Sequence, residues 1–139
     1  KTAEIEGYSQ VAKLFRATAE AELIHAHSHL KALGKIKTTA DTLQAAIAGE
    51  TYEFSEMYPQ FIADAKAEEN TTAALRSFTL ANEAEKVHAK LYQTALTNLE
   101  THETFDYYLC TICGHIHEKG APDVCPICGA KAQAYKKFD

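Results

Sequence analysis

The chain has 139 residues, of which 46% are hydrophobic and 24% are charged, a balance typical of one or two small globular domains rather than a disordered chain. Its net charge of −5 argues against nucleic acid as a partner, because phosphate binding needs a basic surface. No apolar run reaches the roughly 18 residues that a membrane helix requires. No membrane partner is therefore expected, and because the opening residues lack a signal-peptide pattern, a cytoplasmic location is predicted.

Three long amphipathic helices are predicted in the first part of the chain, where the helix formers Ala, Leu, Glu and Lys predominate. The first is expected over residues 8–33, ending at Gly34 as a left-handed cap. The second is expected over residues 40–67, kinked by Pro59, which frees the carbonyl of Ser55. The third is expected over residues 71–99. Helices of about 26 to 30 residues are typical of a bundle, so residues 1–104 are predicted to form an all-α domain.

The first and third predicted helices repeat one another at an offset of 63 residues. Both contain the sequence Glu-Ala-Glu-x-x-His-Ala, at residues 20–26 and 83–89. If the duplicated unit is a pair of helices, the first predicted helix is the second member of its pair. The repeat therefore implies a fourth helix that is missing from this chain or supplied by another chain.

Each predicted helix carries two ionisable residues, three positions apart, in the middle of its apolar stripe. The pairs are Glu22 with His25, Glu50 with Glu53, and Glu85 with His88. Burying an unpaired carboxylate costs several kcal/mol, whereas two divalent cations would neutralise all four. Oxygen-rich ligation with two imidazoles suits iron or manganese better than zinc. The pattern predicts a dinuclear carboxylate site inside a four-helix bundle. Tyr58 lies two turns after Glu50, where its hydroxyl either bonds a ligand carboxylate or simply packs in the core.

All four cysteines lie in the last 30 residues, in two Cys-x-x-Cys-Gly sequences. They are Cys110, Cys113, Cys125 and Cys128. Paired spacing without a secretion signal indicates a metal site rather than disulfides. Two such knuckles form a tetrahedral sulfur site for iron or zinc, and the spacing does not decide between the two metals. The turn-rich segment 105–139 is therefore predicted to be a second, metal-stapled domain.

A carboxylate bundle followed by these two knuckles resembles the rubrerythrin family. The local sequences Ala-Gly-Glu50-Thr-Tyr-Glu53, Met57-Tyr58-Pro59 and Glu85-Lys-Val-His88 carry the resemblance. It implies a ferritin-like bundle with a non-haem diiron site, followed by a rubredoxin-like domain with one iron on four cysteines. In that family's first helix a further Glu ligand is expected, and no position of this chain matches it.

The resemblance also implies a role for each predicted ligand. Glu22 and Glu85 correspond to carboxylates that bridge the two irons, and Glu50 and Glu53 to terminal ligands. His25 and His88 correspond to the imidazole ligands. At one iron of the family, a Glu ligand exchanges for a His with redox state, and Glu53 and His25 match that pair.

The implied function is that of a peroxidase, an oxidoreductase that reduces hydrogen peroxide to water. Its electrons would arrive through the rubredoxin-like iron, from NAD(P)H by way of a separate reductase or a rubredoxin, and the implied assembly is a homodimer. Two other hypotheses remain open. One is a ferritin-like ferroxidase that handles iron. The other is an electron carrier or structural protein with an inactive bundle and a zinc- or iron-bound tail.

Overall fold

The computed structural model describes all 139 residues, which form two compact units, residues 1–38 and residues 39–139. The first unit contains the short helix α1 (Thr2–Ile5) and the long helix α2 (Ser9–Ala32). Arg16 of α2 donates to the Glu4 carboxylate at 2.7 Å, which joins the two helices. As predicted, α2 ends before Gly34, whose φ of +63° suits a residue without a Cβ.

The second unit begins with a helical segment that differs from the prediction of one kinked helix. It comprises α3 (Thr39–Tyr52), the π-helical turn η1 (Glu53–Met57) and α4 (Tyr58–Ala67). Pro59 has no amide hydrogen, and its ring would clash with the carbonyl of Ser55 in a regular α-helix. The wider turn relieves this conflict, because the Tyr58 amide bonds the carbonyl of Glu53, five residues back. The irregularity therefore lies before the proline and includes Glu53.

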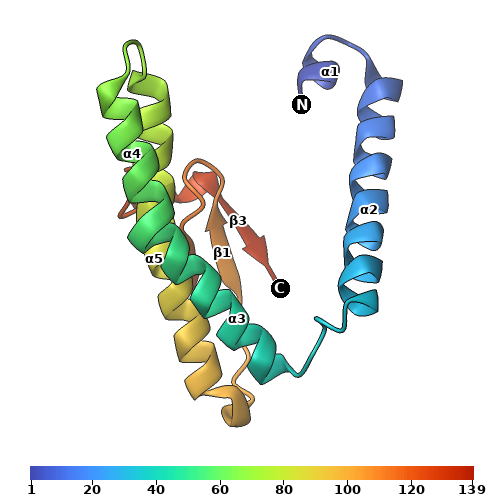
Figure 1. The fold of residues 1–139 in the computed structure, drawn as a ribbon. Coiled ribbons are helices and arrows are strands. Elements are labelled where there is room, and N and C mark those ends of the chain that lie inside the picture. Colours follow the sequence, from blue (N-terminus) through green and yellow to red (C-terminus); the bar gives the residue numbers. More distant parts are fainter. The chain divides into compact units, whose positions relative to one another are not determined.

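Helix α5 (Thr72–Thr97) follows and packs along both α3 and α4 (Figure 1). Small side chains are buried along these helices, namely Ala65 of α4 and Ala84 and Ala89 of α5. At one end of the pair, the rings of Phe61 and Phe78 lie 5.5 Å apart, centroid to centroid. Helix α5 ends two residues before the predicted boundary and is followed by the 3₁₀ turn η2 (Leu99–Thr101).

The tail forms a three-stranded antiparallel sheet in the order β2-β1-β3. Its strands are β1 (Tyr107–Cys110), β2 (Ile116–Glu118) and β3 (Tyr135–Phe138), with the 3₁₀ turn η3 (Ala132–Ala134) before β3. Strand β2 contacts α5, so the sheet and the helix belong to one compact unit.

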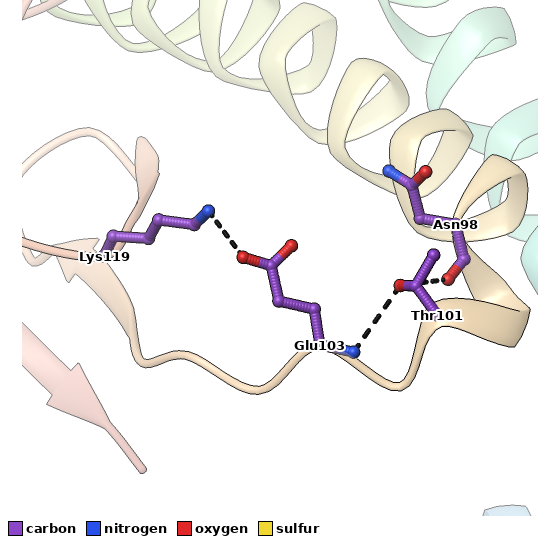
Figure 2. Close-up of polar contacts among 4 residues, drawn as sticks. All are labelled: Asn98, Thr101, Glu103 and Lys119. Carbon is purple, nitrogen blue, oxygen red and sulfur yellow. Dashed lines mark hydrogen bonds and ion pairs between the residues drawn. The ribbon is translucent and has the colours of Figure 1, made fainter.

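The connection between α5 and the sheet is held by polar contacts (Figure 2). The Thr101 hydroxyl donates to the carbonyl of Asn98 at 2.8 Å, which closes the turn after α5. The Glu103 carboxylate accepts from Lys119 Nζ at 2.7 Å and ties the connection to the loop after β2. None of the helices combines the length and the apolar character needed to cross a bilayer.

Candidate metal centres

Two carboxylates and one imidazole converge where α3 meets α5. Glu50 comes from the last turn of α3, and Glu85 and His88 lie one turn apart on α5. One ligand atom from each residue lies within 4.8 Å of the other two. His88 Nδ1 is 2.6 Å from Glu85 Oε2 and 3.7 Å from Glu50 Oε2. The three side chains are only 16–19% exposed, so little water is available to solvate their charges.

The crowding of carboxylates changes the protonation of Glu50. Burial, a hydrogen bond with Glu85 and the negative charges of Glu85 and Glu53 raise the pKa of Glu50 to about 7, against an opposing effect of His88. Without a metal, the Glu50 carboxyl therefore remains partly protonated near neutral pH. A divalent cation would supply the same compensation with two positive charges, so this donor set fits a metal ion.

Glu53 and Tyr58 lie beside this group. Burial, followed by the charges of Glu85, Glu53 and Glu50, raises the pKa of Tyr58, so its hydroxyl keeps its proton at neutral pH. One turn before Glu85 on α5, the buried Oδ1 of Asn82 has no hydrogen-bond partner. This oxygen can accept a hydrogen bond from a polar ligand that reaches it.

The other nitrogen of His88 faces the tail. His88 Nε2 lies 2.9 Å from the carbonyl oxygen of Gly114, the residue that follows Cys113. A carbonyl only accepts hydrogen bonds, so Nε2 carries a hydrogen and Nδ1 is the nitrogen that faces the carboxylates. This bond orients the imidazole in the way that metal-binding histidines usually are. One side chain thus contacts both the carboxylate group and a cysteine knuckle.

The four cysteines converge in the tail with all thiols free. The Sγ atoms of Cys110 and Cys128 are 3.7 Å apart, and those of Cys113 and Cys125 are 3.6 Å apart. A tetrahedral site with metal–sulfur bonds of about 2.3 Å has sulfur–sulfur edges of about 3.8 Å, whereas a disulfide requires about 2.05 Å. The sulfurs therefore stand at the spacing of metal ligands.

Local backbone geometry builds this sulfur site. Gly114 and Gly129 follow the second cysteine of each knuckle with φ of +83° and +76°, a conformation that favours glycine. Burial opposes ionisation of Cys125, but hydrogen bonds from the Cys128 amide, the Tyr135 hydroxyl and the Ile127 amide outweigh it and lower its pKa to about 6. At least one thiolate is thus available at neutral pH to begin metal binding.

Comparison with known proteins identifies the family of the chain. The family model for rubrerythrin matches residues 1–96, and the model for the rubredoxin-like domain of rubrerythrin matches residues 108–136. The chain belongs to the rubrerythrin family. The predicted family and the predicted fold class, three long helices of a ferritin-like bundle followed by a rubredoxin-like domain, are therefore confirmed. The boundary between residues 104 and 105 stays a prediction.

Its relatives within the rubrerythrin family include nigerythrin of Nitratidesulfovibrio vulgaris, which is 38% identical over 92% of this chain and 70% of nigerythrin. Rubrerythrin-2 of Clostridium acetobutylicum is 34% identical over 98% of this chain and 83% of the relative. Among solved structures, the fully reduced, all-ferrous state of nigerythrin superposes with a TM-score of 0.69 at 34% identity, covering 99% of this chain and 74% of nigerythrin.

Two predicted ligands lie in the other unit. Glu22 and His25 are neighbours on α2, with Oε2 and Nδ1 3.4 Å apart, and their side chains are 70% and 60% exposed. The apolar stripe of α2 that contains Glu22 and His25 was expected to be buried. It is exposed, as are its apolar members Phe15 and Leu33. Residues 1–38 hold one long helix and one short helix, too little to form a second layer that would cover this stripe. The ligand roles of Glu22 and His25 stay predictions.

Sequence reasoning missed one side-chain group in the tail. His115 is 4% exposed, and its Nδ1 lies 2.7 Å from the hydroxyl of Tyr135, which also interacts with Cys125. A His two residues after a cysteine and a Tyr in an aromatic-rich tail carry no motif of their own. Only the pairing of β1 with β3 places Tyr135 opposite Cys110.

Proposed function

We propose that this rubrerythrin-family protein is a peroxidase that reduces hydrogen peroxide according to H₂O₂ + 2H⁺ + 2e⁻ → 2H₂O. The observation that carries the proposal is the position of His88. Its Nδ1 faces Glu85 and Glu50, and its Nε2 bonds the backbone of Gly114 at 2.9 Å. A carboxylate centre and a sulfur centre are thereby joined within one compact unit by a single side chain, an arrangement that suits electron delivery.

The donor sets of the two centres fit iron. Two irons would be held by the carboxylate and imidazole ligands, which are Glu22, His25, Glu50, Glu53, Glu85 and His88. When bound, these irons would supply the two electrons that peroxide requires, and one iron on the four cysteines would restore them singly. The relative whose structure is described as all ferrous supports iron at such sites. The alternation of Glu53 and His25 at one iron belongs to this proposal.

The chain's own residues would prepare the site in three ways. The bond from His88 Nε2 to Gly114 holds the imidazole so that Nδ1 points at the carboxylates. The Tyr58 hydroxyl, with its raised pKa, keeps a proton beside Glu85 and Glu53 and can donate a hydrogen bond there. The low exposure of Glu50 and Glu85 limits the water that competes for these donors.

Electrons must come from another protein, and family resemblance supports an NAD(P)H-linked reductase or a rubredoxin in this role. The same resemblance supports a homodimer. The alternative of a ferroxidase that handles iron has no need for a second centre joined to His88. We therefore expect peroxide reduction rather than iron storage.

The experiment uses the full chain, loaded with iron and reduced without oxygen. Iron is first counted, with two irons expected at the carboxylate site and one at the cysteines, and the oxidised protein is expected to be red from ferric tetrathiolate. Hydrogen peroxide is then added in a stopped-flow instrument. One peroxide should be consumed for every two electrons, with no iron mineral formed.

Matched variants make this test specific to the site. Glu85→Gln should slow the reaction with peroxide by about a hundredfold, because it removes a ligand carboxylate, while the red colour of the tail persists. Glu83→Gln changes an exposed residue that pairs with Lys86, and it should react at the wild-type rate. Equal rates in both variants, or a protein that accumulates ferric mineral with oxygen and ignores peroxide, would contradict the peroxidase.

A further inference from the structure

A tyrosine and a buried histidine lie directly against the four-cysteine site. In the antiparallel ladder of β1 and β3, Tyr135 is the partner of Cys110, so the two side chains stand side by side on the same face of the sheet. The Tyr135 hydroxyl also lies near Cys125 and interacts with its sulfur. It therefore contacts the cluster from the strand that closes the sheet.

Behind the phenol lies His115. Its side chain is 4% exposed, and its Nδ1 is 2.7 Å from the Tyr135 hydroxyl. The two rings meet edge to face with centroids 6.0 Å apart. The backbone of His115 is fixed as well, since its carbonyl accepts from the Cys110 amide at 2.8 Å. The imidazole is thus held by the knuckle itself and has little freedom to turn away.

The number of hydrogens sets the direction of these bonds. A phenol carries one hydrogen, and a metal-bound thiolate only accepts. With a metal present, the Tyr135 hydrogen therefore goes to Cys125 Sγ, and the phenol oxygen accepts from His115 Nδ1–H. Hydrogen bonds in such a chain strengthen one another, because accepting a hydrogen bond makes the phenol a better donor.

We propose that Tyr135 and His115 form a hydrogen-bond chain that raises the reduction potential of the iron on the four cysteines. Tyr135 acts directly on Cys125, and His115 is a positioning residue that acts through Tyr135. The proposal rests on the proposed function in one respect, which is that the cysteines hold iron.

The physical reason is the charge on the sulfurs. When the site takes one electron from the donor protein, iron(III) becomes iron(II), and the four-thiolate unit changes from one net negative charge to two. No bond breaks, and the proton stays on the phenol oxygen. A hydrogen bond to sulfur stabilises the more negative state more strongly, so it favours the reduced form.

The test is a spectroelectrochemical titration of the visible absorbance of the full iron-loaded chain. Tyr135→Phe keeps the ring and removes the donor, and we expect the equilibrium constant for reduction to fall about tenfold, or about 59 mV for a one-electron couple. Tyr107→Phe is the matched control. Tyr107 lies on β1 three residues before Cys110, which places it on the opposite face of the sheet. The reduction potential of the iron in this variant should therefore equal that of the wild type.

A double-mutant cycle separates the chain from a general packing effect. His115→Phe should lower the potential in the same direction as Tyr135→Phe but by less. In the Tyr135→Phe background it should lower the potential no further, because its effect passes through the phenol. A structural role for His115 would instead produce the same shift in both backgrounds.

A Tyr135→Phe potential equal to that of the wild type, or equal shifts in Tyr135→Phe and Tyr107→Phe, would overturn the inference. If the Tyr135→Phe variant cannot hold iron, the inference is tested by His115→Phe alone. An unchanged reduction potential in His115→Phe would then overturn the inference. A tail that accepts only zinc refutes this inference together with the proposed function. A shifted potential in a protein that does not reduce peroxide refutes only the peroxidase.

Discussion

The protonation of Glu50 offers a direct test of the carboxylate site in the metal-free protein. Its pKa rises from the usual 4.5 to about 7, first because of burial and then because of Glu85. Between these two pH values the folded chain binds more protons than the unfolded chain. The free energy of unfolding should therefore fall as pH rises from about 4.5 to 7, and the loss should be complete above pH 7.

The size of the effect follows from the shift. Each pKa unit corresponds to about 1.4 kcal/mol, so the rise to about 7 sets a ceiling of roughly 3 kcal/mol. The Glu50 side chain is 19% exposed and hydrogen-bonded to Glu85, so a loss of about 1 to 3 kcal/mol is expected. Glu50→Gln places a neutral amide of the same shape at this position. It should remove that loss and make the metal-free protein more stable at pH 8, with little change at pH 5.

The assay is urea unfolding of the full chain, followed by circular dichroism at several pH values after the carboxylate site has been emptied by dialysis. Glu83→Gln is the control, since its side chain is 49% exposed and pairs with Lys86. It should leave the pH dependence unchanged and shift stability by less than about 1 kcal/mol. Manganese(II) or iron(II) should stabilise the wild type at pH 8 and stabilise Glu50→Gln much less. Parallel pH profiles for wild type and Glu50→Gln would refute the reasoning.

Three further predictions concern the tail and its contact with α5. Cys110→Ser removes a ligand that is 1% exposed. The iron-loaded chain should lose its visible absorbance and the sheet its near-UV circular dichroism, while the far-UV signal of the helices persists. Ala84→Leu should destabilise the protein by about 1 to 3 kcal/mol in urea, because Ala84 is 1% exposed and its Cβ stands 3.9 Å from where a Cβ on Gly114 would lie. Ala73→Leu, at an exposed position of the same helix, should be neutral in that measurement. Gly129→Ala meets no neighbour within 4 Å but keeps a φ of +76°. It should therefore cost about 1 to 2 kcal/mol through backbone strain alone, measured as the loss of thermal stability of the metal-loaded chain.

The elements with strong local signals were predicted well. Periodic apolar residues and Gly34 placed α2 within one residue of its observed ends, and the two Cys-x-x-Cys-Gly sequences predicted a convergence of sulfurs that the structure shows. Glu85 and His88 share a face because residues three apart on a helix always do. Such features are determined by residues that are close in the sequence, so they can be predicted without the tertiary structure.

The π-helical turn η1 shows where a local rule was incomplete. Pro59 predicted an irregularity in the helix, but a proline in the sequence does not determine whether the helix kinks or widens into a π-helical turn. The answer depends on how α3 and α4 both remain packed on α5, because a widened turn lets the helix continue past the proline while both halves keep their contacts.

Residue types, their spacing and the resemblance that they carry were sufficient to identify the family, and they predict the two metal centres and the candidate ligands, since helix periodicity and knuckle geometry act over a few residues. Contacts between distant segments required the folded chain. The hydrogen bond between His88 and Gly114 joins residues 26 positions apart. The pairing of Cys110 with Tyr135 depends on the register of β1 and β3, which forms only when the chain between these strands has folded. Burial, too, is a property of two packed surfaces. For this reason, Glu85 and Glu22 occupy equivalent places in the repeat, yet one is 16% exposed and the other 70%.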